Sequence, residues 1–384
     1  MATEFNVGLN VQQINYFEKK IVKRMRVESL ADQLASEGGD AAIHRVTDLK
    51  NTTWGYKAIM TMVPDDTSHG VVGDNRLQDH EAGITAHDLE ITFDQFRKAF
   101  KNEGVMADRS VWFKFAQQAS DQLAFWAKDT KDRLMMNTLA GVGYEYEVDG
   151  SLRTAACDWK NNRFADNVTA PSPNRHFRWD VSTTNNLIGN ASTDDVVATD
   201  LPTWNMFLDM RSELPLMRIK PIRGKWGNGQ DLYIAVVHPR TLNVLKKDPD
   251  FIANMRYSMP RGKENPVFRG AESYMIDGIL IIAHRYAYNT LGAASGSKWG
   301  SGGLVNGART LFLGAQALGM VEIGNPKWVT RTDDFENQIA ISMAYKFGFR
   351  KTVWPDQWAA NSNEDFGVCV VDHAIPSGAT SYTI

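Results

Sequence analysis

The sequence is poor in cysteine, and no part of it is apolar enough to cross a bilayer. Its two cysteines, Cys157 and Cys369, are far apart and stand in no CxxC or Cys/His spacing, so they give neither a disulfide framework nor a zinc site. We expect both to be small, buried apolar side chains. No apolar run approaches the roughly 20 residues of a membrane-spanning helix. The first residues lack a basic-then-apolar secretory pattern, which indicates a product of the cytoplasm.

The chain also lacks a large net charge, because its acidic and basic residues nearly balance. The 384 residues carry a formal net charge of −3, which gives the chain no electrostatic reason to coat nucleic acid. Hydrophobic residues make up 43% of the chain and the mean hydropathy is −0.35. That composition predicts a globular protein with a substantial core, built as one large unit or as two interleaved units.

Motifs for catalysis or metal binding are missing too. There is no GxSxG, and the eight histidines show no HExxH or other metal-ligand spacing. Residues 292–298 resemble a phosphate loop only superficially, because the spacing before the lysine is wrong, and they are better interpreted as a flexible linker. Asp79, His80 and Glu81 are consecutive, so on an extended chain they point to opposite faces. Three carboxylate pairs lie in loop-like sequence: Asp65-Asp66, Asp194-Asp195 and Asp333-Asp334. We therefore predict no enzyme, no cofactor, and no catalytic or metal residues.

Residues 1–43 are predicted to be an N-terminal arm. A helix is plausible from Gln12 to Ala35 and ends before Gly38-Gly39, although its sparse apolar positions make it marginal alone. Five basic side chains gather within it beside one acid, Glu18: Lys19, Lys20, Lys23, Arg24 and Arg26. Two interpretations remain open for this basic cluster, a solvated helix face or contact with an acidic neighbour or packaged DNA.

Two strand-like runs, residues 56–63 and 89–96, indicate a long hairpin. In the second run Leu89, Ile91 and Phe93 alternate with polar residues, which is typical of a strand with one wet face. The connection, residues 64–88, has six acids against one arginine, a net charge of −5: Asp65, Asp66, Asp74, Asp79, Glu81 and Asp88, with Arg76. This projection has no core of its own, and in a monomer it would be exposed to aggregation and proteolysis. Docking on a neighbouring copy would protect it, so these seven residues are candidate inter-subunit contacts.

Residues 109–140 give the strongest helix signal. Apolar side chains recur at steps of four and three, Asp108 or Ser110 can cap the start, and Gly141 stands where a C-terminal cap belongs. At 1.5 Å per residue the helix is roughly 45 Å long, which suggests a structural spine.

The remainder alternates short helices and strands. Residues 141–199 are polar and irregular, an expected insertion, and the Gly-rich residues 289–308 predict a mobile loop. Helices are expected at 204–210 and 240–247, the latter broken by Asp248-Pro249, and strands at 232–237, 278–283, 310–313, 338–345 and 368–371. The fold class is therefore α+β, with no βαβ rhythm and no internal repeat.

The order of arm, long hairpin, spine helix and second mixed domain resembles the HK97-type capsid fold of tailed double-stranded DNA phages. More specifically, it resembles the major capsid family typified by the "N-four"-type podoviruses. The segments that carry this resemblance are Gly70 to Glu81 with Ile91 to Gln95, Leu123 to Trp126 with Leu139 to Gly141, Val237-His238-Pro239 followed by Leu242 to Lys247, and Gly278 to Ile281.

The resemblance implies a domain plan. Residues 1–43 would be the arm and 44–95 the extended loop (E-loop). Residues 96–200 and 318–354 would form the peripheral (P) domain with spine helix 109–140, and residues 201–317 and 355–384 the axial (A) domain. No residue matches the covalent cross-link of the fold's namesake, so closure is expected to be non-covalent.

The function implied is a structural one: a major capsid protein that self-assembles into hexamers and pentamers of an icosahedral shell around the double-stranded DNA genome. Expected partners are further copies of the chain, scaffolding, portal and decoration proteins, and DNA contacted without sequence specificity. No membrane partner is expected. Its expected location is the virion capsid after synthesis in the host cytoplasm. Two alternatives stay open: an encapsulin-like compartment shell or another phage structural protein such as a tail tube, and, more remotely, a phage-borne hydrolase.

Overall fold

The computed structural model describes most of the chain. The described residues are 29–46, 57–62, 69–81, 83, 86–104, 115–181, 186–223, 231–258, 273–335, 337–355 and 363–377. Most of the predicted N-terminal helix therefore lies outside the described residues. Its described end is the short helix α2 (Leu30–Leu34), and Ala35 already belongs to a strand.

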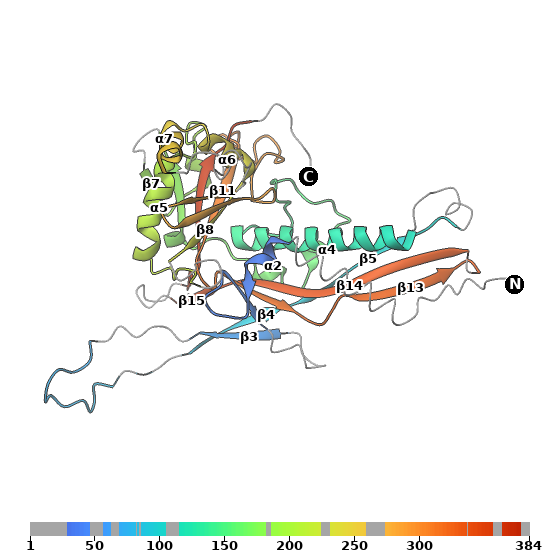
Figure 1. The fold of residues 1–384 in the computed structure, drawn as a ribbon, viewed down its shortest axis with the longest axis horizontal. Helices are drawn as coiled ribbons and strands as arrows, with labels where there is room; N and C mark the ends of the chain where they lie inside the picture. Colours follow the sequence, from blue (N-terminus) through green and yellow to red (C-terminus); the bar gives the residue numbers. More distant parts are fainter. Residues whose placement is uncertain are drawn as a thin grey trace.

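A six-stranded sheet forms one half of the body. Its order is β1 (Ala35–Ser36), β2 (Ile43–Val46), β12 (Leu318–Glu322), β14 (Gln338–Lys351) and β13 (Lys327–Asp333), with β5 (Asp94–Lys101) also paired to β14. The long helix α4 (Phe115–Ala140) runs along this sheet (Figure 1).

A seven-stranded sheet forms the other half. Its order is β7 (Asn186–Gly189), β6 (His176–Asp180), β17 (Val368–Ala374), β11 (Gly307–Leu313), β8 (Tyr233–Val237), β10 (Ile279–Ala283) and β9 (Ser273–Ile276). Helices α5 (Trp204–Leu216), α6 (Pro239–Leu245) and α7 (Pro249–Ser258) follow its strands in the chain. Helices and sheets mix without a regular alternation, which confirms the α+β class.

The predicted lack of a βαβ rhythm agrees with the order of the elements, although a helical crossover occurs in the seven-stranded sheet. Strands β8 and β10 pair in parallel, with Tyr233 opposite Ile279, and α6 and α7 lie in the connection between them. The crossover is difficult to predict from the sequence, because Asp248-Pro249 divides its helical part into two short helices, α6 and α7.

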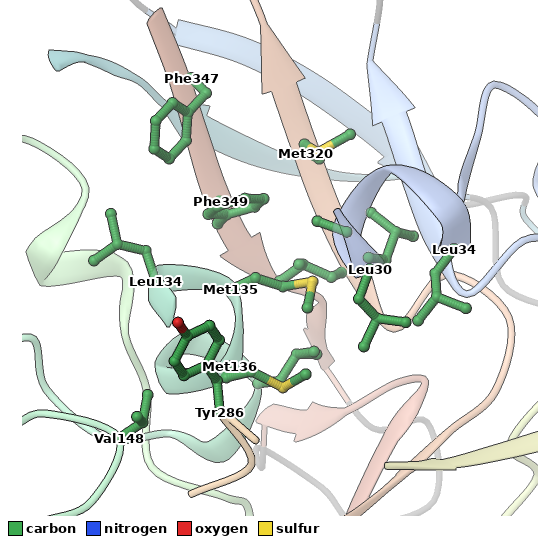
Figure 2. Packing of buried hydrophobic residues seen from close by; sticks show 14 of the residues in the cluster. Leu30, Leu34, Leu134, Met135, Met136, Val148, Tyr286, Met320, Phe347 and Phe349 are labelled. Carbon is green, nitrogen blue, oxygen red and sulfur yellow. The ribbon is translucent and has the colours of Figure 1, made fainter. Parts of the chain in front are cut away.

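The C-terminal half of α4 lies in the core between the two sheets. Every residue from Leu134 to Ala140 is buried. Figure 2 shows Leu134, Met135 and Met136 pointing among Phe349 of β14, Met320 of β12 and Tyr286. Alternate residues of the seven-stranded sheet face this core or a second one under α5 and α6, which explains why all of β8 is apolar and buried.

The spine prediction is confirmed over the described part. Helix α4 ends at Ala140, and Gly141 follows with φ +67°. The Val142 N–H donates to the Asn137 carbonyl (3.0 Å) and the Gly141 N–H to the Thr138 carbonyl (3.2 Å), a Schellman cap that needs glycine. The expected start at 109–114 lies outside the described residues.

Two loop predictions had different outcomes. Residues 141–199 are indeed irregular, with short 3₁₀ turns and the strands β6 and β7. Residues 289–308 are not an open linker: Asn289 and Thr290 are buried, and bridges join Asn289 to Ala308 and Trp299 to Val305. Glycine in this segment permits close packing of the backbone, because a Cβ on Gly307 would lie 1.7 Å from the Trp299 ring.

The predicted hairpin exists as β3 (Lys57–Met62) paired with β4 (His87–Thr92), Lys57 opposite Thr92. The expected strand 89–96 is two strands: β4 ends at Thr92, and β5 begins at Asp94 in a different sheet. The other predicted helices and strands are confirmed, and β15 (Val353–Pro355) pairs with β16 (Asn363–Asp365). Cys369 is buried as expected, but Cys157 is partly exposed.

Candidate assembly surfaces

The stem of the hairpin packs on the body of its own chain. Strands β3 and β4 alternate, so that Ala58, Met60, Leu89 and Ile91 are buried while Ile59 on the other face is half-exposed. The buried side chains contact Val46, Val321 and Trp354. The expectation of a projection without a core of its own is therefore wrong for the stem, because the chain's own sheet supplies one.

Hairpin and spine lie on opposite faces of the six-stranded sheet. Along β12, Met320 joins the core around α4, whereas Val321 joins the cluster under the hairpin. Gly319 also faces the hairpin: a Cβ there would lie 2.4 Å from Ile91 Cδ1. Successive residues of a strand point to opposite faces. Figure 1 shows the same arrangement, with α4 above β14 and β3 below it.

The tip of the hairpin stands away from the body. Figure 1 shows the described tip residues 69–81 beyond the stem, far from either sheet. Their side chains are almost all exposed, including Val72 at 79% and Leu77 at 60%. The tip residues form no strand, and a long projecting loop without regular structure is usually functional, which favours a tip that is covered in an assembly.

The seven candidate contact residues do not all lie in the tip. Asp74, Asp79 and Glu81 are exposed there and form no ion pair with any described residue, and Arg76 bonds to Gln78. Asp88 belongs to β4, where its carboxylate accepts from the Thr61 hydroxyl (2.6 Å). Asp65 and Asp66 lie outside the described residues.

A buried network of charges fixes the end of the arm to the spine. Lys131 of α4 is fully buried and donates to Asp32 of α2 (2.7 Å) and to Glu322 of β12. Arg45 of β2 is also paired with both acids, and Tyr345 donates to Glu322. Burial alone would raise the pKa of Glu322, but Lys131 and Arg45 outweigh it and lower the pKa to about 2.

The arm is held at a second point as well. The Ser29 hydroxyl donates to Asp132 (2.6 Å), and the Ala31 N–H donates to the same oxygen (3.2 Å). Neither contact could be predicted from the sequence, because the partners are about 100 residues apart. The basic cluster Lys19, Lys20, Lys23, Arg24 and Arg26 precedes this anchor and lies outside the described residues.

A second buried network joins the seven-stranded sheet to the end of the spine. Arg309 of β11 pairs with Asp372 of β17, and its Nη1 donates to the Ala140 carbonyl at the last turn of α4 (2.6 Å). Asp372 also bonds to His176 of β6 (2.6 Å). Burial opposes ionisation of Asp372, yet Arg309 and His176 together lower its pKa to about 2. These contacts join the end of the spine to the seven-stranded sheet.

The residues considered for chemistry do not converge. Among the described residues, no group of three or more His, Cys, Asp and Glu side chains could hold a metal ion. Asp333 pairs with Arg331 (2.7 Å) and Lys101 (3.2 Å) at a strand end, and Asp194 and Asp195 lie in a surface turn. His238 caps α6 by accepting from the Arg240 N–H (3.2 Å).

No helix in the described portion of the chain is long and apolar enough to cross a membrane.

Two sheets with a long helix between them and a hairpin projecting from one side define the HK97-type class of shell subunits. Solved phage capsids share this fold. The capsid of Ralstonia phage GP4 is similar with a TM-score of 0.72 at 20% identity, covering 90% of this chain and 91% of that one. The cyanophage Pam1 capsid is similar with a TM-score of 0.65 at 15% identity, covering 93% of each chain.

Sequence comparison gives the family. Residues 6–377 match the phage capsid protein family, and the chain is 38% identical over 360 residues to the major capsid protein of Pseudomonas phage KPP25, covering 94% of each. The chain belongs to the phage capsid protein family. Its role is that of a major capsid protein, a structural subunit of the phage shell, as the sequence predicted. The podovirus subgroup stays a prediction.

Proposed function

We propose that copies of this chain form hexamers and pentamers, which close non-covalently into an icosahedral shell around double-stranded DNA. The hairpin carries this proposal: its stem is fixed to the body, while its acidic tip extends beyond the body with exposed apolar side chains. A closed shell needs contacts of one surface with a different surface of the next copy. A tip that reaches past its own subunit supplies such a contact.

The domain plan is part of the proposal. The arm, residues 1–43, includes α2, and residues 44–95 form the E-loop. The P domain consists of α4 and the six-stranded sheet, to which the arm adds β1 and the start of the E-loop adds β2. The seven-stranded sheet forms the A domain. Strands β6 and β7 pair with β17 in that sheet, which supports moving residues 176–189 from the P domain to the A domain.

Partners beyond the chain itself are proposed on the family's architecture. A closed phage head requires a portal, and scaffolding and decoration proteins are the other expected partners. The arm's basic cluster, residues 19–26, precedes the anchor at Ser29 and is proposed to touch an acidic neighbour or the packaged DNA. Replacing its five basic residues by Gln should lower the yield of DNA-filled particles. Unchanged yield and packaging would identify the cluster as a solvated face.

We also propose that the chain has no catalytic role, against the hydrolase alternative. A glycosidase acid pair needs two carboxylates converging in one cleft. The paired carboxylates that the structure describes lie in a surface turn and at a strand end instead.

The hairpin is tested by shortening it without disturbing its stem. Met62 lies opposite His87, so residues 63–86 can be replaced by Asn-Gly, the preferred two-residue hairpin turn. We expect a folded protein with an unchanged melting temperature that forms no shells in negative-stain microscopy. A matched control replaces the same residues by a neutral Gly/Ser loop of equal length. This control keeps the length of the hairpin and removes its charge, so it distinguishes the effect of length from the effect of charge. Shells of normal yield from the shortened variant would refute the proposal.

The encapsulin-like alternative is tested with the same particles. A phage shell assembled in infected cells should contain double-stranded DNA, whereas a compartment shell should contain protein cargo. Nuclease-protected nucleic acid in purified particles is the measurement.

A further inference from the structure

A basic pocket of about 430 Å³ lies between the spine helix and helix α6. Lys128 of α4, Lys246 at the end of α6, and His284, Arg285 and Tyr286 after β10 contribute to its wall. None of its lining residues is acidic. No contact described so far uses this pocket.

Two of its three cations form no ion pair within the part of the chain that the structure describes. Lys128 and Lys246 form no ion pair with any described residue, and their Nζ atoms lie over the rings of Phe125 (5.8 Å) and Tyr274 (5.2 Å). Arg285 pairs with Asp129 (3.1 Å), a carboxylate that Arg133 shares. The pocket therefore keeps an excess of positive charge.

A neutral histidine completes the wall. The His284 Nδ1 atom is buried and has no hydrogen-bond partner within the described residues. Burial and, to a smaller extent, the charges of Lys128 and Arg285 lower the pKa of His284 to about 4. The ring therefore stays neutral at neutral pH.

The pocket and the acidic hairpin belong to opposite sides of the six-stranded sheet. The pocket's wall includes α4, which packs on the face that carries Met320, and the hairpin packs on the face that carries Val321. In a shell one subunit thick, all copies turn the same face inward. The hairpin connection, residues 64–88, has a net charge of −5 and would be repelled by enclosed DNA, so electrostatics directs the hairpin outward and α4 inward.

We propose that this pocket binds backbone phosphate of the enclosed DNA, with Lys128, Lys246 and Arg285 as the phosphate contacts. The inference rests on the proposed function, since it requires a shell that encloses DNA. Such contacts position the duplex and read no sequence. A second copy's acidic tip is the competing occupant, but neighbours in a single-layer shell present that tip on the opposite side.

The test uses the full-length protein held unassembled, with a labelled 20-base-pair duplex as the probe. The variant Lys128→Gln/Lys246→Gln is compared with a matched control, Lys327→Gln/Lys346→Gln. Both control lysines are exposed and stand next to residues that face α4, so they point to the hairpin side. Each lost phosphate contact should reduce the slope of log affinity against log salt by about 1. We expect a reduction of about 2 for the pocket variant and none for the control.

Three results would overturn the proposal. One is an equal change in both variants, and another is no change in either. The third is a synthetic peptide of residues 64–88 that binds the wild-type protein but not the pocket variant, which would assign the pocket to the hairpin tip. Lys246→Gln alone, at an exposed position, serves if the double variant melts at a lower temperature than the control.

Failure of the pocket and failure of the proposed function are distinguishable. Shell formation is scored separately by microscopy, and the pocket variant should form shells that hold less DNA. If the wild-type chain forms no shells, the proposed function fails whatever the duplex does. If shells form and the salt slope is unchanged, only the pocket assignment fails.

Discussion

Arg309 holds Asp372 at two points, with Nε 2.7 Å from Oδ1 and Nη2 2.8 Å from Oδ2, and both side chains are buried. The residues are opposite each other in the antiparallel pair β11 and β17. The third contact of the guanidinium, to the Ala140 carbonyl, reaches the end of the spine helix. Arg309 of β11 thus contacts both β17 of the seven-stranded sheet and the end of α4, which packs on the six-stranded sheet.

Arg309→Met should therefore destabilise the protein strongly. Removing one partner of a buried pair leaves an uncompensated charge, which costs about 3–5 kcal/mol of unfolding free energy. The measurement is chemical unfolding of the unassembled chain. The control is Arg331→Met, whose pair with Asp333 is exposed, so that the unfolding free energy should change little. Equal effects in the two variants would contradict the role given to Arg309.

Lys131→Met should release the arm from the spine. Asp32 and Glu322 would lose their shared buried cation, although Arg45 remains beside them. We expect faster proteolytic cleavage within residues 29–46 and a lower melting temperature. Lys327→Met, at an exposed site, is the control. Cleavage at the wild-type rate would mean that the Ser29–Asp132 contact alone holds the arm.

Gly348→Ala should disturb the base of the hairpin. A Cβ at Gly348 would lie 2.0 Å from the Thr92 carbonyl and 2.8 Å from Phe93 Cα, where β4 turns into β5. Backbone cannot rotate away as a side chain can, so the junction must shift. We expect a folded subunit with reduced shell yield, measured by light scattering. Gly83→Ala, where a Cβ meets nothing within 4 Å, should assemble normally. Identical shell yields of the two variants would contradict a role of Gly348 in positioning the hairpin.

The sequence predicted the elements better than their contacts. Periodicity located α4, β8, β11, β14 and both hairpin strands, because local spacing decides which face of an element is buried. It merged β4 with β5, since the apolar alternation continues through Phe93 while the backbone changes sheets. It also took the Gly-rich residues 289–308 for a mobile loop, although glycine there permits close packing against Trp299.

The candidate assembly surfaces could be predicted from the sequence only in part. The acidic connection of residues 64–88 is visible in composition, because a charged run with few apolar residues cannot bury itself. The buried networks around Lys131 and Arg309 were missed, since single charged residues in a sequence look the same whether they are solvated or paired. Only the tertiary structure brings Asp32 to Lys131 and Asp372 to Arg309.

Stability should fall with acidification in two separate pH ranges. His373 is fully buried, accepts from the Thr310 hydroxyl (2.9 Å), and has a pKa lowered to about 4, mainly by burial. Its unfolded pKa is near 6.5, so between about pH 6.5 and 4 only the unfolded chain takes up the proton. The stabilisation is complete above that range and is lost as the pH falls, by up to about 1.4 kcal/mol per pH unit. Between about pH 4 and 2, Asp372 and Glu322 act in the same direction because their folded pKa values are near 2.

The variant His373→Gln removes one contribution to the first range, while His238 and His284, whose pKa values burial also lowers to about 4, remain. Glutamine can accept from Thr310 and donate to the Ala374 carbonyl, as His373 does, but it takes up no proton. We expect a smaller loss of unfolding free energy between pH 6.5 and 4, with the loss between pH 4 and 2 unchanged. His69→Gln, in the exposed hairpin tip, should leave both ranges unaltered. A wild-type pH profile from His373→Gln would show that this ring is protonated in the folded protein, or that other groups set the profile, and it would remove His373 as the cause.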